Sequence, residues 1–177
     1  MMSDMARLLE PLIPSLRRYA RAMLRDSSAA DDLVQDGLER AITRWHQRRA
    51  DGDARSWLFA IVHNLAINRL RQSARRGPHL PLDSAEESGP TQPPRQEEGL
   101  RQRDLMRALE TLPEEQRSVV LLVSVEDLSY AEVAHVLGVP VGTVMSRLSR
   151  GRERLRLAVD GGVASGPAGE ARLRRIK

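Results

Sequence analysis

The sequence predicts an all-α protein made of two small helical domains. Apolar residues recur at helical spacing in several long segments, whereas the alternation typical of strands is almost absent. Residues 77–98 separate these segments and hold five of the chain's ten prolines together with several acidic residues, a composition that cannot bury a core. We expect domains at residues 8–76 and 99–159, a flexible linker at residues 77–98 and a mobile basic tail at residues 160–177.

Three helices are expected in the N-terminal unit. The first spans about residues 8–24. The second starts after Ser28, which forms a loose capping signal with Asp31, and runs to about Trp45. The third begins near Asp53 and runs to about Arg75. Its buried stripe consists of Leu58, Ile61, Val62, Leu65 and Leu70.

The C-terminal unit is predicted to end in a helix-turn-helix. A helix over residues 100–109 and another starting at Pro113 precede it. Ser129 and Glu132 form a capping box for a helix that begins at about Tyr130. Gly138 is a suitable C-terminal residue for this helix, and Pro140 suits the first turn of the next.

The second helix of this motif is basic on one side. Val144, Leu148 and Leu155 form its apolar stripe, and the other face carries Thr143, Ser146, Arg147 and Arg150. Such side chains can reach base edges and phosphates in a major groove. The alternative is an ordinary helical hairpin with a solvated basic face. Because caps, turn, stripe and charge all agree, we favour DNA binding.

The charge distribution also indicates a polyanionic partner. The formal net charge is only +4, but residues 54–82 contain five arginines and no acidic residue. Residues 141–156 contain five arginines and a single glutamate. Clustering of this kind favours nucleic-acid binding. Lys177 is the only lysine, so the chain uses arginine at almost every basic position. A general preference for arginine over lysine would explain this, but it would not explain why residues 54–82 and 141–156 contain almost no acidic residue.

Several classes of function have no support in the sequence. There is no cysteine, the four histidines are scattered, and no phosphate loop or nucleophile elbow is present. We therefore expect no enzymatic activity, metal or cofactor. No apolar run approaches the roughly 20 residues of a membrane span, and the N-terminus has no signal-peptide core. No membrane insertion and a cytoplasmic location are expected.

Two clusters in the N-terminal unit suggest binding surfaces. The second helix carries Asp31, Asp32, Gln35, Asp36 and Glu39 largely on one side, which is either a solvated acidic face or a docking surface for a basic partner. The third helix carries Asn64 and Asn68 one turn apart, followed by arginines, near Trp45 and Trp57. Amide, aromatic and guanidinium groups can hold unstacked bases. The alternatives are surface amides and, for Trp57, a core position.

The order of these motifs resembles a known family. It runs through DDLVQDGLERA, a polar loop, SWLFAIVHNLAINRLRQSARR, the proline-rich linker, LETLPEEQRSVVLL and LSYAEVAHVLGVPVGTVMSRLSRGRERL. This arrangement is similar to that of extracytoplasmic-function (ECF) sigma factors of bacterial RNA polymerase, over about residues 8–158. This chain departs from the family pattern at two places. Arg48–Arg49 stands where family members often have an aromatic residue followed by arginine, and Met145 stands where many have a basic residue.

The resemblance implies roles for both units. The chain would bind core RNA polymerase at its flap and at the clamp helices of its largest subunit. The residues that dock on the clamp helices would be Asp31, Asp32, Gln35, Asp36 and Glu39. The −10 promoter element would be held by Arg48, Arg49, Trp57, Ile61, Asn64 and Asn68, with Arg71 and Arg75 along the DNA backbone. The −35 element would be read by Thr143, Ser146, Arg147 and Arg150. An anti-sigma factor would be the expected regulator.

Three other functions compete with promoter recognition. A free-standing DNA-binding regulator would need a dimer interface or ligand pocket, and no coiled-coil heptads or cofactor motif is present. A decoy that titrates an anti-sigma factor would be expected to carry a further regulatory domain. A hydrolase or transferase lacks site residues. The sequence therefore favours a polymerase specificity subunit.

Overall fold

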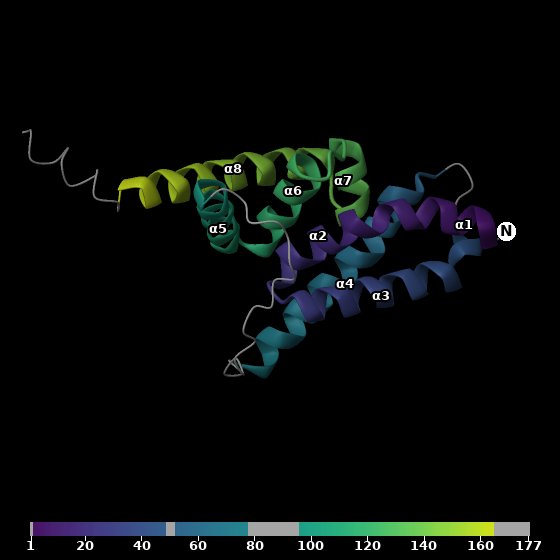
Figure 1. Cartoon of the computed structure of the whole chain (residues 1–177). Coiled ribbons are helices and arrows are strands. Elements are labelled where there is room, and N and C mark those ends of the chain that lie inside the picture. The colour runs from purple at the N-terminus through teal and green to yellow at the C-terminus, as the bar shows by residue number, and fades with distance from the viewer. Residues whose placement is uncertain (1, 49–51, 78–95, 165–177) are drawn as a thin grey trace, which may run out of the picture.

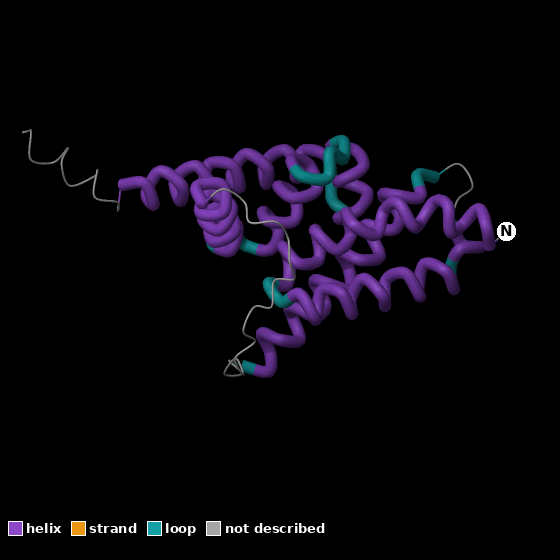
Figure 2. Tube along the Cα trace, in the orientation of Figure 1, coloured by secondary structure: helices purple, strands orange, loops and turns teal. Residues whose placement is uncertain are grey.

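The computed structural model describes residues 2–48, 52–77 and 96–164. Within these ranges the chain is helical and forms no strand, as Figure 2 shows. The all-α prediction is therefore confirmed. Two units lie side by side, one formed by α1 to α4 and the other by α5 to α8 (Figure 1).

The N-terminal unit contains α1 (Met2–Leu9), a 3-10 turn (Glu10–Leu12), α2 (Ile13–Leu24), α3 (Ser27–Thr43), a second 3-10 turn (Trp45–Gln47) and α4 (Ala54–Arg76). The prediction of one continuous helix over residues 8–24 was wrong. Pro11 and Pro14 lack the amide hydrogen that a helix interior needs, and the helix is interrupted where they occur.

Aspartates cap the next two helices. The Asp26 carboxylate accepts a hydrogen bond of 2.9 Å from the Ala29 amide, so α3 begins before Ser28 and Ser28 is not its cap. Asp53 accepts bonds from the amides of Arg55 and Ser56 at 3.2 and 2.7 Å, which confirms the predicted start of α4.

The C-terminal unit contains α5 (Gln96–Glu110), α6 (Glu114–Ser124), α7 (Tyr130–Leu137) and α8 (Val141–Ala164). The predicted capping box is confirmed, because Ser129 Oγ accepts from the Glu132 amide and the Glu132 carboxylate accepts from the Ser129 amide. Gly138 ends α7 with φ of +64°. The helix-turn-helix is thus formed by α7 and α8.

Two helices extend beyond the expected boundaries. α8 continues past residue 159 to Ala164, although Gly161 and Gly162 had suggested the start of a tail. α5 begins at Gln96, inside the segment expected to be linker. In both places a helix extends from its stable part at low cost into residues that would not nucleate one.

The core of the N-terminal unit lies between α2, α3 and α4. Its largest fully buried side chains include Tyr19 and Phe59, whose rings meet edge to face with centroids 5.7 Å apart. Gly37 of α3 allows close approach to α4, since a Cβ there would lie 2.8 Å from Val62 Cγ2.

The two units share one continuous hydrophobic core. α7 packs against α4, and α6 packs against α2. This contact places the helix-turn-helix beside the helix that carries Asn64 and Asn68. This packing decides which residues of the two units lie close to each other.

Candidate functional site

The acidic cluster of α3 forms an exposed surface with one exception. Asp32, Gln35, Asp36 and Glu39 are all exposed. Gln35 Nε2 donates to Glu39 Oε1 at 3.1 Å, and Asp36 lies 3.7 Å from an Arg69 nitrogen. Asp31 instead turns towards α2, where both of its carboxylate oxygens accept from Arg21 at 3.1 Å. Four of the five predicted docking residues therefore share one accessible face, while Asp31 joins α2 to α3.

The loop before α4 carries an aromatic cluster. Trp45 and Trp57 meet edge to face with ring centroids 6.0 Å apart. The Arg48 guanidinium lies 4.8 Å from the centroid of the Trp45 ring and donates to the Gly52 carbonyl at 2.6 Å. Trp57 is half-buried, so it packs against the core and also reaches the surface. Arg49 lies outside the described residues.

The predicted −10 face of α4 is directed towards the C-terminal unit. Asn64, Asn68 and Arg71 are exposed, yet they line a cavity of about 320 Å³. The other lining residues come from α6, the end of α7, the turn after it and α8; they are Glu114, Glu115, Ser118, Leu137, Val139 and Arg147. Ile61 is half-buried, and Arg75 is exposed near the end of α4.

A histidine at the edge of this cavity was missed by the sequence analysis. His63 is buried, and its Nδ1 lies 2.8 Å from the Tyr19 hydroxyl. Burial lowers the pKa of His63 to about 4, and the positive charges of Arg147 and Arg71 act in the same direction. The imidazole is therefore neutral at pH 7. His63 lies next to Val62 and three positions before Ala66, both of which are buried in α4. This spacing in the sequence could have indicated that His63 is buried.

The recognition helix α8 separates its predicted DNA-reading residues into two groups. Val144 and Leu148 are buried, whereas Ser146 and Arg150 are exposed on the other side. Thr143 and Arg147 are half-buried, and Arg147 pairs with Glu115 at 3.1 Å.

The exposed side of α8 also includes residues that the sequence analysis did not select. Met145 is 53% exposed, and Gly142 and Ser149 are exposed as well. At 100° per residue, Gly142, Ser146 and Ser149 lie opposite the buried stripe of Val144 and Leu148. That spacing could have identified them. Charge drew attention to Arg147 instead, which lies nearer the edge of the stripe.

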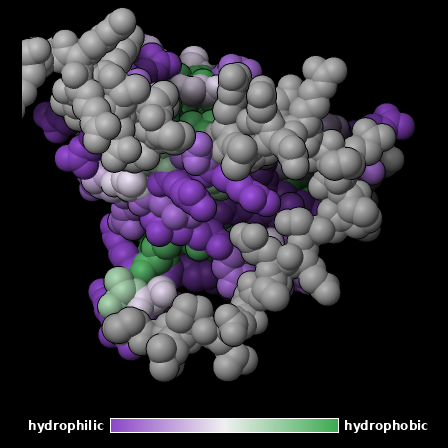
Figure 3. Space-filling model, turned by 60° about the vertical axis from the view of Figure 1, so that its left-hand side comes forward, coloured by the Kyte–Doolittle hydropathy of each residue, from purple (hydrophilic) through white to green (hydrophobic). Residues whose placement is uncertain are grey.

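The described part of the chain shows where hydrophobic surface lies and whether it holds a membrane-spanning helix or a metal-binding group. The part of the face in Figure 3 that the structure describes is mainly hydrophilic, with small hydrophobic areas. Within residues 2–48, 52–77 and 96–164, no helix is both long enough and apolar enough to cross a membrane. The same ranges contain no group of three or more histidine and carboxylate side chains able to hold a metal.

Sequence comparisons find family models that match each unit and relatives that match both units. The sigma-70 region 4 family matches residues 102–155, and the sigma2 domain of PhyR matches residues 9–63. The chain is 34% identical over 157 residues to the ECF RNA polymerase sigma factor EcfG of Rhodopseudomonas palustris, covering 88% of this chain and 86% of EcfG. It is 36% identical over 141 residues to the ECF RNA polymerase sigma-E factor of Escherichia coli, covering 73% of each chain.

Solved structures show the same architecture. The sigma factor RpoE of Bartonella quintana, in complex with the anti-sigma factor NepR, matches with a TM-score of 0.76 and 26% identity, covering 89% of this chain and 97% of RpoE. CnrH, in complex with the cytosolic domain of CnrY, shares the fold with a TM-score of 0.69 at 24% identity, covering 91% of this chain and 90% of CnrH. Because relatives above 30% identity extend over both units, the chain belongs to the ECF sigma factors of bacterial RNA polymerase.

Proposed function

We propose that this sigma factor uses three separate surfaces, one for core polymerase and two for promoter DNA. The acidic face of α3 (Asp32, Gln35, Asp36 and Glu39) docks on the clamp helices of the largest polymerase subunit. The aromatic loop and α4 hold the −10 element, and the exposed side of α8 reads the −35 element. The observation that carries this proposal is the segregation of exposed carboxylates on α3 from exposed amide and guanidinium groups on α4 and α8, with the half-buried Trp45–Trp57 pair near the start of α4.

The aromatic loop suits an unstacked base. Trp45, Trp57 and Arg48 present ring faces and a guanidinium group within one cluster. Stacking on such groups is worth about 1–3 kcal/mol per base. Arg48 here occupies part of the place where the family often has an aromatic residue, and its guanidinium lies over the Trp45 ring, so we assign it the role of stacking on a base beside that ring. Asn64 and Asn68 would then hydrogen-bond base edges, and Arg71 and Arg75 would follow phosphates.

The exposed side of α8 suits a major groove. Ser146 and Arg150 can donate to base edges or phosphates, and Thr143 lies at the margin. Met145 adds an exposed apolar group at a position where the family often has a basic residue. An apolar side chain contacts the methyl group of thymine favourably, so we assign Met145 a preference for thymine.

The two units act together on one enzyme. We assign residues 8–76 to polymerase and −10 binding and residues 99–159 to −35 binding, joined by residues 77–98. Each contact can be weak alone, because a second contact on the same polymerase gains from a high effective concentration.

The proposed regulator is an anti-sigma factor of the NepR class. Three observations support this choice: the 34% identity with EcfG, the match of residues 9–63 to the PhyR sigma2 domain, and the similarity to RpoE in its NepR complex. Purified NepR-class protein is expected to bind the chain one to one and to compete with core polymerase. Simultaneous binding of both would contradict this assignment.

The match to PhyR also favours a second candidate function. PhyR is described as an anti-anti-sigma factor in the structure of its NepR complex, and that chain shares the fold with this one at 17% identity. A decoy of this kind would bind NepR-class protein without initiating transcription.

Run-off transcription separates the two candidates. Core polymerase and the purified chain are incubated with a library of promoter fragments, and transcripts are sequenced. The proposal predicts discrete start sites that require the chain. Transcripts equal to those of core polymerase alone, together with tight binding of NepR-class protein, would support the decoy.

A further inference from the structure

We propose that the free chain holds itself in a closed state in which the promoter-reading helix α4 packs against the helix-turn-helix unit, and that a latch centred on Glu126 stabilises this state. The inference rests on the proposed promoter contacts of α4 and α8. It concerns the free sigma factor, and it requires no inhibitor chain because every contact described below lies within this chain.

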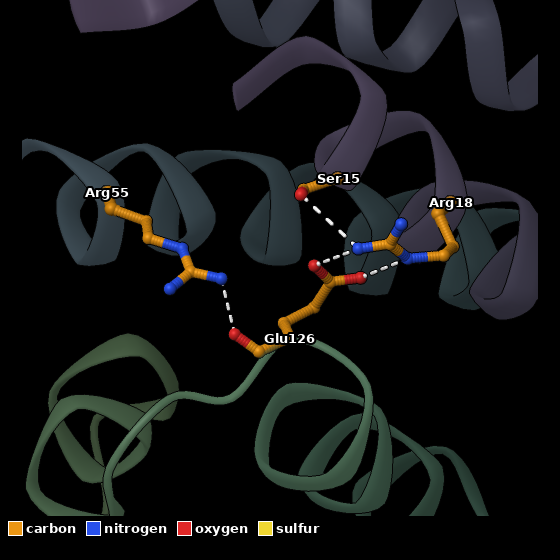
Figure 4. Close-up of polar contacts among 4 residues, drawn as sticks. All are labelled: Ser15, Arg18, Arg55 and Glu126. Atoms are coloured by element: carbon orange, nitrogen blue, oxygen red, sulfur yellow. Dashed lines mark hydrogen bonds and ion pairs between the residues drawn. The ribbon is translucent and has the colours of Figure 1, made fainter. Parts of the chain in front are cut away.

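Glu126 lies in the turn between α6 and α7, and its hydrogen-bond donors are arginines of the N-terminal unit. Its side chain is completely buried, and its two carboxylate oxygens accept from Arg18 Nε and Nη2 at 2.9 and 2.8 Å. The Glu126 carbonyl accepts from Arg55 Nη2. Figure 4 shows Arg18 and Arg55 reaching the same turn from α2 and α4, with Ser15 beside the Arg18 guanidinium. A buried carboxylate is costly unless it is paired, and the pairing here exists only when the units are together.

Two further arginines link helix ends across the same interface. Buried Arg117 of α6 donates to the Met23 carbonyl near the end of α2, at 3.0 Å. Arg25, just after α2, donates to the Glu110 carbonyl at the end of α5, at 2.6 Å. Carbonyls at helix C-termini lack partners within their helix and carry partial negative charge. Each unit therefore supplies a cation that caps a helix of the other.

The closed arrangement is incompatible with simultaneous promoter reading. Asn64 and Asn68 of α4 line the same 320 Å³ cavity as Arg147 of the recognition helix. The −10 and −35 elements are centred about 25 base pairs apart, which is about 85 Å at 3.4 Å per base pair. Helices α4 and α8 both line this small cavity and cannot present their exposed faces to elements that far apart, so the units must separate on the promoter. A latch that favours closure thus lowers the fraction of chain able to bind DNA and polymerase productively.

Closure also has a consequence for polymerase affinity. When only a fraction of the chain is competent, the apparent dissociation constant rises by the inverse of that fraction. Weakening the latch is therefore expected to tighten polymerase binding without any change at the acidic face of α3.

The test measures the separation of the units directly. The chain contains no cysteine, so cysteines introduced at exposed Arg17 and Val125, which adjoin Arg18 and Glu126 in the two units, can carry a donor and an acceptor dye. Single-molecule energy transfer is recorded on the full chain, alone and with core polymerase. The free wild-type chain is expected to show mainly short separations, and polymerase is expected to shift it to long ones.

The latch variants are Glu126→Gln and Arg18→Ala. Either is expected to raise the ratio of open to closed chain by roughly tenfold, which corresponds to about 1.4 kcal/mol. Because both remove the same contact, the double variant is expected to open little further than either single one. Arg18 is half exposed, so Arg18→Ala remains informative if Glu126→Gln lowers the helical content.

Glu153→Gln is the matched control. Its carboxylate pairs with Arg156 at 2.8 Å on the same helix, away from the interface, so the open fraction should stay at the wild-type value. Long separations in the free wild-type chain, or equal open fractions in Glu126→Gln and Glu153→Gln, would overturn the proposal. These readouts do not use transcription. A chain that closes and opens as expected but gives no promoter-specific transcript would instead count against the proposed function.

Discussion

Two arginines of the recognition helix, three positions apart, occupy different environments. Arg150 is exposed on the side of α8 that faces away from the core. Arg147 is only 23% exposed in its side chain, pairs with Glu115 and lines the cavity beside α4. Equal charge therefore gives unequal access to a major groove, and the two residues should differ in function.

Truncating these arginines tests that difference. Arg150→Ala is expected to lower transcription from promoters that depend on their −35 element by roughly tenfold, since a good base contact is worth about 1–3 kcal/mol. Arg147→Ala is expected to lower it less. Both should leave binding to core polymerase nearly unchanged. A larger loss for Arg147→Ala in run-off assays would show that Arg147 leaves Glu115 to read DNA.

The buried His63 makes stability sensitive to acid. The pKa of His63 falls from 6.5 to about 4 in the folded chain. Between these values the unfolded chain binds one proton more than the folded chain, so the free energy of unfolding decreases as pH falls from 6.5 towards 4. The full effect is on the order of 3 kcal/mol. The groups that face it from α2, α4, α6 and α8 are Tyr19, Arg71, Glu114, Glu115 and Arg147.

Urea denaturation at pH 7 and pH 5 measures this effect. His63→Gln, which can still hydrogen-bond Tyr19, is expected to lose less stability on acidification than the wild type. His46→Gln, at an exposed site, should retain the wild-type acid sensitivity. If His63→Gln and His46→Gln respond to acid equally, the buried imidazole is not the source.

Helix contacts in the N-terminal unit depend on close approach at one glycine. A Cβ at Gly37 would meet Val62 Cγ2 at 2.8 Å, and the β-branched valine has little freedom to move away. Gly142 in α8 is a useful comparison, because a Cβ there meets nothing within 4 Å.

Alanine substitution is therefore expected to have opposite effects at these two glycines. Gly37→Ala should lower the free energy of unfolding by about 1–3 kcal/mol through overpacking. Gly142→Ala should raise it by about 0.5–1 kcal/mol, because alanine loses less conformational entropy in a helix. Thermal and urea unfolding measure both. A Gly37→Ala chain as stable as the wild type would mean that α3 and α4 separate easily.

The acidic face of α3 predicts a clear effect on polymerase binding. Asp32→Arg with Asp36→Arg should weaken core binding by at least about tenfold through repulsion, while costing little stability, because the Asp36–Arg69 pair is solvent-exposed. Glu153→Arg with Asp160→Arg on α8 changes the net charge equally and serves as the control. Equal binding by both double variants would remove α3 from the docking surface.

Helices with strong local signals could be predicted closely from the sequence. The capping box at Ser129, the glycine at 138 and the Asp53 cap fix their helix ends through contacts within a few residues. The break near Pro11 and the choice of Asp26 over Ser28 were not predicted, because several capping and breaking residues adjoin and periodicity does not choose between them. Exposed site residues on α3 and α8 followed from helical spacing, whereas the half-buried state of Arg147 did not.

The packing of the two units lies beyond the reach of sequence patterns. Arg18 and Glu126 are 108 positions apart, and Arg117 and Met23 are 94 positions apart. Neither pair belongs to a local motif, and arginine is abundant throughout the chain, so composition does not mark the residues that bridge the units. The closed form therefore emerges only from the three-dimensional structure, which brings the DNA-reading helices α4 and α8 to the walls of one cavity.

The most direct measurement is a titration of the purified chain against bacterial core RNA polymerase without DNA, compared with a titration against duplex DNA at physiological salt. We expect tight one-to-one binding to core polymerase and weak binding to duplex DNA, because in the free chain α4 and α8 line one cavity and cannot reach both promoter elements at once. Tight, salt-sensitive binding to duplex DNA with none to core polymerase would contradict it and would identify a stand-alone DNA-binding regulator.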